Sequence, residues 1–173
     1  MVGNKFDKVG FVKLEKEDKE GIPAMSKLAT AIVREYYDPI LGTAQNDYML
    51  DMFQSEHAIR EQLEHGVSYY FIDADGAAIG FFAFYPKKSY LYLSKFYIEA
   101  ESRGRGAGKR SLEFISGEAR KLGFDRIELN VNKNNFETIK FYEAAGFERV
   151  RSEKNDIGNG FFMDDYVYGL KLL

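Results

Sequence analysis

The sequence predicts a mixed α/β fold, in which helices flank both faces of a mixed, mostly antiparallel β-sheet with one parallel strand pair. Apolar residues follow a helical spacing up to His65, and short β-rich runs replace that pattern after Gly66. Later in the chain a strand, a helix and a strand follow one another, and such a βαβ unit pairs its strands in parallel. A chain of 173 residues without a linker-like segment predicts a single domain over residues 1–173.

The amino-terminal part is predicted to be mostly helical from Pro23 onward. Apolar residues recur there three and four positions apart: Met25, Leu28, Ala29, Ile32, Val33 and Tyr36. Pro39 and Gly42 interrupt this run. A second helical stretch covers residues 58–63, and Ser55 precedes it as the expected N-cap.

Three β-rich runs follow, at residues 67–73, 78–85 and 89–98. The turn Asp73-Ala74-Asp75-Gly76 separates the first two, and Asp-Gly between apolar runs is a strong hairpin signal. The apolar residues of the third run do not keep one strict alternation, which a β-bulge would explain.

The carboxyl-terminal part alternates between helix and strand. A helix is expected over residues 108–122, with Leu112, Ile115, Ala119 and Leu122 on one stripe and Gly123 after its end. A strand follows at residues 126–131, and then a helix that Asn134 or Asn135 caps and that ends at Gly146. Residues 147–153 and 161–172 are expected to form the last strands.

Composition and charge exclude several function classes. The chain has no cysteine and only two histidines, His57 and His65, so we expect no metal site and no cysteine nucleophile. Its net charge of −3 argues against a general nucleic-acid surface. The longest apolar run, residues 77–85, is far too short to span a membrane, so a cytoplasmic protein is expected.

A glycine-rich loop at residues 103–110 carries the clearest functional signal. It holds Gly104, Gly106 and Gly108 together with four basic residues, and it lies between a predicted strand and a predicted helix. Glycines allow close backbone approach to a ligand, and the first N–H groups of a helix attract anions. A phosphate-bearing ligand is therefore expected, although a solvated glycine loop with exposed cations would have the same residues.

Two familiar phosphate-binding loops do not match this segment. A P-loop needs Ser or Thr after Gly-Lys, whereas Arg110 follows Lys109 here. A dinucleotide fingerprint that starts at Gly104 would need glycine at position 109, and one that starts at Gly106 would need glycine at Ser111.

Three motifs in order narrow the choice of ligand. They are Arg103-x-x-Gly106-x-Gly108, Val131-x-x-x-Asn135 and Phe141-Tyr142-x-x-x-Gly146-Phe147. Together they resemble the GCN5-related N-acetyltransferase (GNAT) family, whose acetyl-CoA loop has the pattern Arg/Gln-x-x-Gly-x-Gly/Ala. The resemblance is strong from about residue 91 to 150, and Thr138 stands where many members have alanine. The region around residues 36–63 is somewhat similar to the bacterial polyamine-acetylating members.

The resemblance implies acetyl-CoA as the cosubstrate and assigns its contacts. Loop amides hold the pyrophosphate, the preceding strand pairs with the pantetheine arm, and Asn135 contacts the pantetheine. The implied cofactor-binding residues are Phe96, Tyr97, Ile98, Arg103, Gly104, Arg105, Gly106, Ala107, Gly108, Lys109, Asn135 and Tyr142. Arg105 or Arg110 suits the 3′-phosphate, while Lys109 and Arg110 are equally consistent with an ordinary helix surface.

The same resemblance places Tyr142 near the sulfur, where it protonates the departing thiolate. A phenol with a pKa near 10 can serve this purpose when it is close to the thiolate. On the residues alone, a buried aromatic side chain is the favoured explanation of Tyr142. Without a cysteine, the amine is expected to attack the thioester directly. Glu99, or an acid from the amino-terminal helices, is a candidate base.

The acceptor pocket of the family lies between the amino-terminal helices and the last strands. Tyr36, Tyr37 and Asp164 are the implied substrate-binding residues, and further acids surround them in the sequence: Asp38, Asp47, Asp51, Glu56 and Asp165. Carboxylates with tyrosines suit a small cationic or polyamine-like primary amine, although charged helix faces are solvated by default.

Three functions therefore stay open. The first is N-acetylation of a small amine, and the second is acetylation of a protein amino terminus or lysine. The third is a catalytically inactive CoA-binding regulatory module, which the presence of Tyr142 disfavours. A small-molecule amine is the expected partner, without nucleic acid or membrane. The family often pairs through its sheet edges, which leaves a homodimer open.

Overall fold

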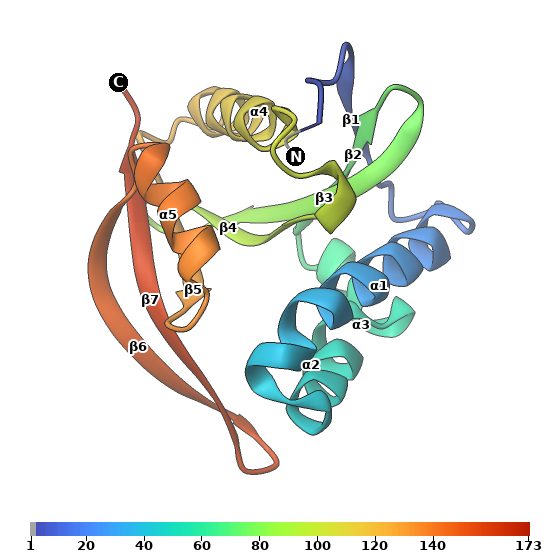
Figure 1. Cartoon of the computed structure of the whole chain (residues 1–173), viewed down its shortest axis with the longest axis vertical. Helices are drawn as coiled ribbons and strands as arrows, with labels where there is room; N and C mark the ends of the chain where they lie inside the picture. The colour runs from blue at the N-terminus through green and yellow to red at the C-terminus, as the bar shows by residue number, and fades with distance from the viewer. Residues whose placement is uncertain (1–2) are drawn as a thin grey trace. The chain divides into compact units, whose positions relative to one another are not determined.

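The computed structural model describes residues 3–173 (Figure 1). These residues form two compact units. The first unit contains residues up to 85 and residues 95–113, and the second contains residues 86–94 and 114–173. Strand β4 (Leu91–Ile98) and helix α4 (Ala107–Lys121) each begin in one unit and end in the other. The sheet has the strand order β1-β2-β3-β4-β5-β7-β6. The predicted mixed α/β class is confirmed.

The first unit contains three helices and an antiparallel set of strands. Its helices α1 (Gly21–Leu41), α2 (Thr43–Gln54) and α3 (Glu56–Glu64) pack on one another. Its strands are β1 (Val9–Lys13), β2 (Ser68–Ala74) and β3 (Ala77–Pro86), together with the end of β4. Buried side chains of α1, α3, β2 and β3, together with Leu14 just after β1, share one apolar core: Leu14, Ile22, Met25, Ala29, Ile32, Ile59, Tyr69, Phe81 and Ala83.

Local sequence signals account for the turns and caps of this unit. The predicted hairpin is confirmed, because β2 pairs antiparallel with β3 and both Asp75 and Gly76 have positive φ, at 49° and 90°. Ser55 caps α3 by accepting a hydrogen bond from the Ala58 N–H at 3.1 Å, as expected. Pro39 lies inside the last turn of α1, and the helix ends just before Gly42, whose φ is 81°.

The second unit contains the parallel strand pair. The beginning of β4 pairs in parallel with β5 (Arg126–Asn132), and β7 (Phe161–Lys171) lies antiparallel to β5 and to β6 (Glu148–Gly158). The long hairpin of β6 and β7 is the orange-red ribbon pair in Figure 1. Helix α5 (Phe136–Ala144) follows β5, and its N-cap is Asn135 rather than Asn134. The strands and helices predicted here are confirmed, with ends shifted by a few residues.

Burial along β4 explains the irregular alternation of its sequence. Leu91, Leu93 and Lys95 are all buried, with exposed fractions of 0%, 3% and 8%. The inward face therefore continues through position 95, where a lysine occupies a buried place. On α4, Leu112, Ile115 and Ala119 are buried as predicted, whereas Leu122 is 56% exposed because the helix ends before it.

Across residues 3–173, none of the helices combines the length and the apolar character that crossing a membrane demands.

Candidate functional site

The glycine-rich loop leads directly into helix α4 in the first unit. A short 3-10 helix (Ala100–Ser102) precedes it, and Gly104 and Gly106 take positive φ values of 73° and 90°. Among the described atoms, none lies within 4 Å of the place where a Cβ on Gly106 would stand. Helix α4 begins at Ala107, so its first-turn N–H groups lack intrahelical acceptors. The loop can thus offer several backbone donors and a positive helix end to an anion.

Arg103 connects the loop to the end of β4 and to α1. Its Nε donates a hydrogen bond to the carbonyl oxygen of Ile98 at 2.8 Å. Its guanidinium carbon lies 4.4 Å from the ring centre of Tyr36, in a cation–π arrangement. A residue predicted to bind the cofactor is thus in contact with one predicted to bind the acceptor.

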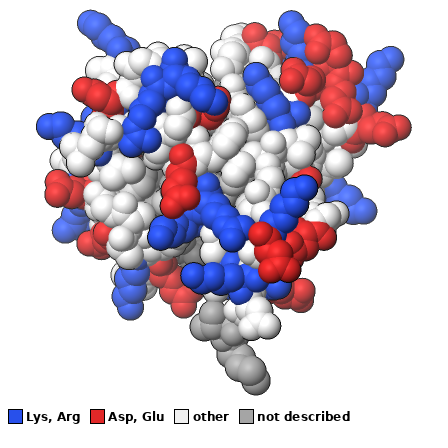
Figure 2. Space-filling model, turned by 90° about the horizontal axis from the view of Figure 1, so that it is seen from above, with Lys and Arg blue, Asp and Glu red and all other residues white. Residues whose placement is uncertain are grey.

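Arg105 is turned toward the amino-terminal segment. Its Nε donates to the carbonyl oxygen of Asn4 at 2.7 Å, and its guanidinium carbon lies 3.8 Å from the ring centre of Phe6. By contrast, Lys109 is exposed and Arg110 is half-buried. Figure 2 shows basic and acidic side chains interspersed on the face that it presents. Across the described residues of this face, no large area is covered by basic side chains alone.

The end of β4, where pantetheine pairing is predicted, depends on a glycine that the sequence reasoning did not select. A Cβ on Gly80 in β3 would overlap the carbonyl oxygen of Tyr97 and would approach the Cα of Ile98 to 3.0 Å. The rings of Phe96 and Tyr97 pack on Phe82 and Phe81, at 6.4 and 5.4 Å between ring centres. A glycine inside an apolar strand pattern was the available signal for such a close approach.

Glu99 follows β4 and is fastened at both its backbone and its side chain. Its N–H donates to the carbonyl oxygen of Ile79 at 2.9 Å, and its carboxylate accepts a hydrogen bond from the Ser102 hydroxyl at 2.7 Å. Ser102 is buried. One carboxylate oxygen of Glu99 is therefore engaged within the loop.

Lys95 is the most unusual polar group of the first unit. Its ammonium donates to the carbonyl oxygen of Phe53 at 2.6 Å, to Gln62 Oε1 at 2.9 Å and to Gln54 Oε1 at 3.2 Å. It also contacts the hydroxyl of Tyr69. All of these acceptors are uncharged, and burial lowers the pKa of Lys95 to about 7. No local pattern of residues predicts this cluster, because an isolated lysine in a strand is exposed by default.

Two acids, one in α1 and one in α2, are engaged with neighbouring side chains. Asp47 forms an ion pair with Arg34, and Asp38 accepts a hydrogen bond from Asn46 Nδ2 at 2.8 Å. Tyr37 is buried and packs edge-on against Tyr97, with 6.1 Å between ring centres. Of the predicted acceptor residues of the first unit, Tyr36 and Tyr37 thus lie next to each other at 5.6 Å between rings.

In the second unit, Asn135 and Tyr142 are both buried, with exposed fractions of 4% and 5%. The Tyr142 ring packs between Phe141 and Phe147, at 5.5 and 5.3 Å between ring centres. Burial alone is consistent both with an aromatic core position and with a phenol held in place for chemistry, so the predicted role of Tyr142 stays a prediction.

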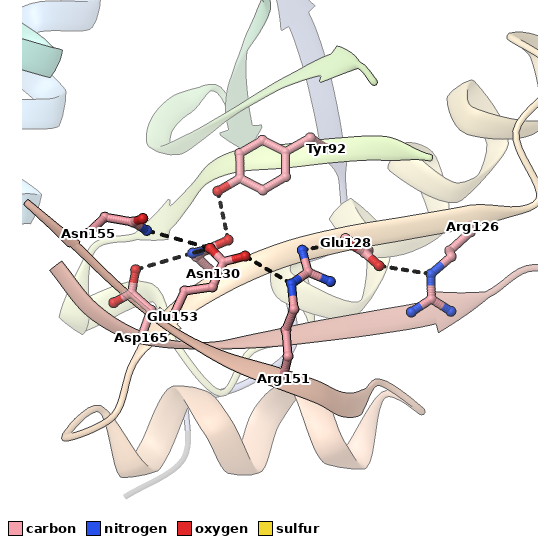
Figure 3. Close-up of polar contacts among 8 residues, drawn as sticks. All are labelled: Tyr92, Arg126, Glu128, Asn130, Arg151, Glu153, Asn155 and Asp165. Carbon is pink, nitrogen blue, oxygen red and sulfur yellow. Dashed lines mark hydrogen bonds and ion pairs between the residues drawn. The ribbon is translucent and has the colours of Figure 1, made fainter. Parts of the chain in front are cut away.

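A polar cluster covers one face of β5, β6 and β7 in the second unit (Figure 3). The Nδ2 of Asn130 donates to Glu153 at 3.3 Å and to Asp165 at 3.4 Å, while its Oδ1 accepts from the Tyr92 hydroxyl at 2.9 Å. The pKa of Asp165 is raised to about 6, chiefly by burial and in smaller part by the nearby charges of Asp164 and Glu153. Asp164, the predicted acceptor residue, forms an ion pair with Lys133 at 2.9 Å.

The other end of this cluster is electrically balanced. Buried Glu128 meets Arg126 at 3.1 Å and Arg151 at 3.3 Å, and Arg151 also pairs with Glu153 at 2.8 Å. The hydrogen bond that Arg151 donates to Glu153 holds the pKa of Glu153 below its usual range. Asp165 differs from Glu128 and Glu153 in its partner, because its hydrogen-bond donor is the neutral amide of Asn130 and not an arginine. Among residues 3–173, no group of three or more His, Asp or Glu side chains is arranged to hold a metal ion.

A family model places the chain among known proteins. The model described as "Acetyltransferase (GNAT) family" matches residues 29–147, which is more than half of the chain. No curated protein matches the sequence.

Solved structures with the same fold cover nearly the whole chain. The PaiA N-acetyltransferase of Thermoplasma acidophilum, in complex with coenzyme A, has a TM-score of 0.77 at 19% identity and covers 95% of this chain and 99% of its own. A GNAT family acetyltransferase of Elizabethkingia anophelis with acetyl-CoA bound has a TM-score of 0.66 at 14% identity, with 96% and 99% covered. An aminoglycoside 6′-acetyltransferase type Ii has a TM-score of 0.64 at 16% identity, with 95% and 97% covered. At these identities the likeness is one of fold.

Proposed function

The chain belongs to the GNAT acetyltransferase family and is an acetyl-CoA-dependent N-acetyltransferase, and from this premise we propose that its acceptor is a small cationic amine. The family membership supports transfer of the acetyl group, and the carboxylates of the second unit support the charge of the acceptor.

We assign the pyrophosphate of acetyl-CoA to the backbone amides of the glycine-rich loop. The open space above Gly106 and the position of the loop directly before the first turn of α4 are the observations that support this assignment. Several convergent N–H donors at a helix start suit a pyrophosphate, because its oxygens are strong, charged acceptors.

Replacing Gly106 with alanine is expected to weaken coenzyme A binding at least about tenfold, because the new methyl group would fill the space assigned to the pyrophosphate. The positive φ of 90° adds a strain of roughly 1–2 kcal/mol. Titration calorimetry with coenzyme A measures the first effect and thermal unfolding the second.

Gly123→Ala is the matched control for this substitution. Gly123 has a φ of 86° and the same open surroundings, but it lies after the end of α4. Both variants should lose similar stability, and only Gly106→Ala should lose affinity. Equal affinity in the two variants would remove the loop from the cofactor site.

We propose that Tyr142 is the general acid of the reaction. The amine attacks the thioester carbon, the tetrahedral adduct collapses, the C–S bond breaks, and the Tyr142 hydroxyl gives its proton to the departing thiolate. Water or a base then takes up the proton that the nitrogen loses. Glu99 is the candidate for that base, and its second carboxylate oxygen is the one that the Ser102 hydroxyl does not engage.

The Tyr142→Phe variant is expected to lower kcat about a hundredfold or more while leaving the dissociation constant of acetyl-CoA nearly unchanged. The proton is needed only when the thiolate leaves, and the ring and its packing against Phe147 are kept. Tyr168→Phe is the control, since Tyr168 is buried in the same unit and its hydroxyl faces Glu143 at 3.5 Å. A Tyr142→Phe enzyme with normal kcat would exclude this role.

The acceptor proposal rests on the carboxylates around Asp165. Glu153, Asp164 and Asp165 lie near one another, and their mutual repulsion contributes to the raised pKa of Asp165. A cationic amine next to them would replace that repulsion with attraction and would lower the pKa of Asp165 again. Glu153, which lies opposite Asp165 across β6 and β7, is partly exposed, so such an amine can reach this face from solvent.

A panel assay tests the acceptor class. Release of free thiol from acetyl-CoA is followed with polyamines, amino sugars, peptide amino termini and peptide lysines at equal concentration. We expect kcat/KM to be highest for a small molecule with two or more positive charges. Preference for the peptides would favour a protein acetyltransferase, and coenzyme A binding without transfer to any acceptor would favour a regulatory module.

A further inference from the structure

The amino-terminal segment of the chain is attached to the glycine-rich loop through one residue, Arg105. The Phe6 N–H donates to the carbonyl oxygen of Arg105 at 3.1 Å, and Arg105 Nε donates to the carbonyl oxygen of Asn4 at 2.7 Å. The guanidinium carbon lies 3.8 Å from the centre of the Phe6 ring, and Phe6 is buried at 6% exposure. Both the backbone and the side chain of Arg105 are thus engaged by residues 4–6.

The position of Arg105 within the loop means that this attachment restricts the conformation of the loop. It stands between Gly104 and Gly106, which both have positive φ values. Glycines have the greatest backbone freedom of all residues, so a loop with two of them needs an external contact to keep one conformation. The residue between the two glycines is where such a contact restricts the loop most.

We propose that the segment from Asn4 to Phe6 braces the cofactor loop and that Arg105 acts as a positioning residue for it rather than as a ligand of the 3′-phosphate. This inference rests on the proposed assignment of the loop to acetyl-CoA. Stacking on Phe6 and donation to Asn4 direct the guanidinium toward the segment. The loop amides then keep the arrangement that the pyrophosphate requires before the ligand arrives.

Two ligands distinguish a positioning role from direct phosphate binding. Dephospho-coenzyme A lacks only the 3′-phosphate, so a residue that binds this phosphate affects coenzyme A alone. A residue that positions the loop affects both ligands equally, because both carry the pyrophosphate. The ratio of the two dissociation constants is therefore the diagnostic quantity, and a general loss of stability would not change it selectively.

The experiment measures both dissociation constants by calorimetry for the wild type, Phe6→Leu, Arg105→Met and the double variant. We expect each single variant to weaken both ligands by the same factor, about tenfold, and to raise the KM of acetyl-CoA with kcat unchanged. The double variant should be no weaker than either single variant, because both substitutions remove one shared contact. Phe6→Tyr keeps the ring and should bind like the wild type.

Phe11→Leu is the matched control, since it removes an aromatic ring of β1 that packs on Phe82, at 5.8 Å between ring centres. It should leave both affinities unchanged. Selective loss of coenzyme A over dephospho-coenzyme A in Arg105→Met would overturn the proposal, and so would wild-type affinity in Phe6→Leu. If the wild type bound neither ligand, the assignment of the loop to acetyl-CoA would be wrong, and the positioning role of Arg105 would be wrong as well.

Discussion

Replacing Gly80 with alanine is expected to lower the free energy of unfolding by about 3 kcal/mol, at the upper end of what overpacking costs. The new Cβ would overlap the carbonyl oxygen of Tyr97, which is a backbone atom and cannot move away by a rotamer change. The end of β4 would have to shift away from β3. Because this end of β4 is proposed to pair with the pantetheine arm, the KM of acetyl-CoA should rise together with the loss of stability.

Gly10→Ala provides the control for a strand glycine. Gly10 lies in β1, and no described atom stands within 4 Å of the place where a Cβ would be, so a methyl group fits there without movement. The measurements are denaturant unfolding and the KM of acetyl-CoA for both variants. The difference between the variants isolates the effect of the close contact between Gly80 and the Tyr97 backbone from the general effect of losing a strand glycine. If Gly80→Ala were as stable and as active as Gly10→Ala, β3 and β4 would not be in the close contact described.

The second large effect is a pH-dependent stability that Lys95 controls. Burial lowers its pKa to about 7 in the folded protein, while the unfolded chain keeps the ordinary value of 10.5. Between these two pH values the unfolded chain binds one more proton than the folded protein. The free energy of unfolding therefore increases as the pH rises. The destabilising contribution is complete below about pH 7, and it is lost progressively as the pH approaches the unfolded value.

Lys95→Met removes this titration and retains a side chain of similar length. The stability of the wild type relative to Lys95→Met should therefore rise with pH above about 7, with a slope of up to about 1.4 kcal/mol per pH unit. Urea unfolding at several pH values measures the slope. The measurement is kept below pH 10 so that Tyr69 does not contribute. Burial raises the pKa of Tyr69 in the folded protein, so above pH 10 this tyrosine would ionise only in the unfolded chain and would lower the stability.

Lys13→Met is the control for this series, because Lys13 is an exposed lysine of β1. Its stability should stay parallel to that of the wild type across the pH range. A Lys95→Met variant that also stayed parallel to the wild type would show that Lys95 is not desolvated in the folded protein.

Much of the fold could be predicted because its signals are local. The hairpin at Asp75-Gly76 needs two residues with positive φ, and the cap at Ser55 needs only a hydroxyl three residues before an amide. The glycine-rich loop before α4 is equally local, since its pattern and the following helical stripe are contiguous. These features depend on residues within a few positions of one another.

The candidate site could be predicted only in part, because partners far apart in the chain decide the state of each side chain. Asp164 was selected for the acceptor, yet it pairs with Lys133, while its neighbour Asp165 is the buried carboxylate with the raised pKa. Their adjacent positions on a strand put them on opposite faces, and the sequence does not reveal which face is covered.

The sequence by itself determined most of the helices and strands, the glycine-rich loop before α4 and the family to which the chain belongs. Only the tertiary structure decided that Lys95 is buried among neutral acceptors and that Gly80 allows the backbone of Tyr97 to approach. It also brought Arg105 to Asn4, 101 positions earlier in the chain. Burial and hydrogen-bond partners arise from such distant contacts, and local patterns of residue type do not encode them.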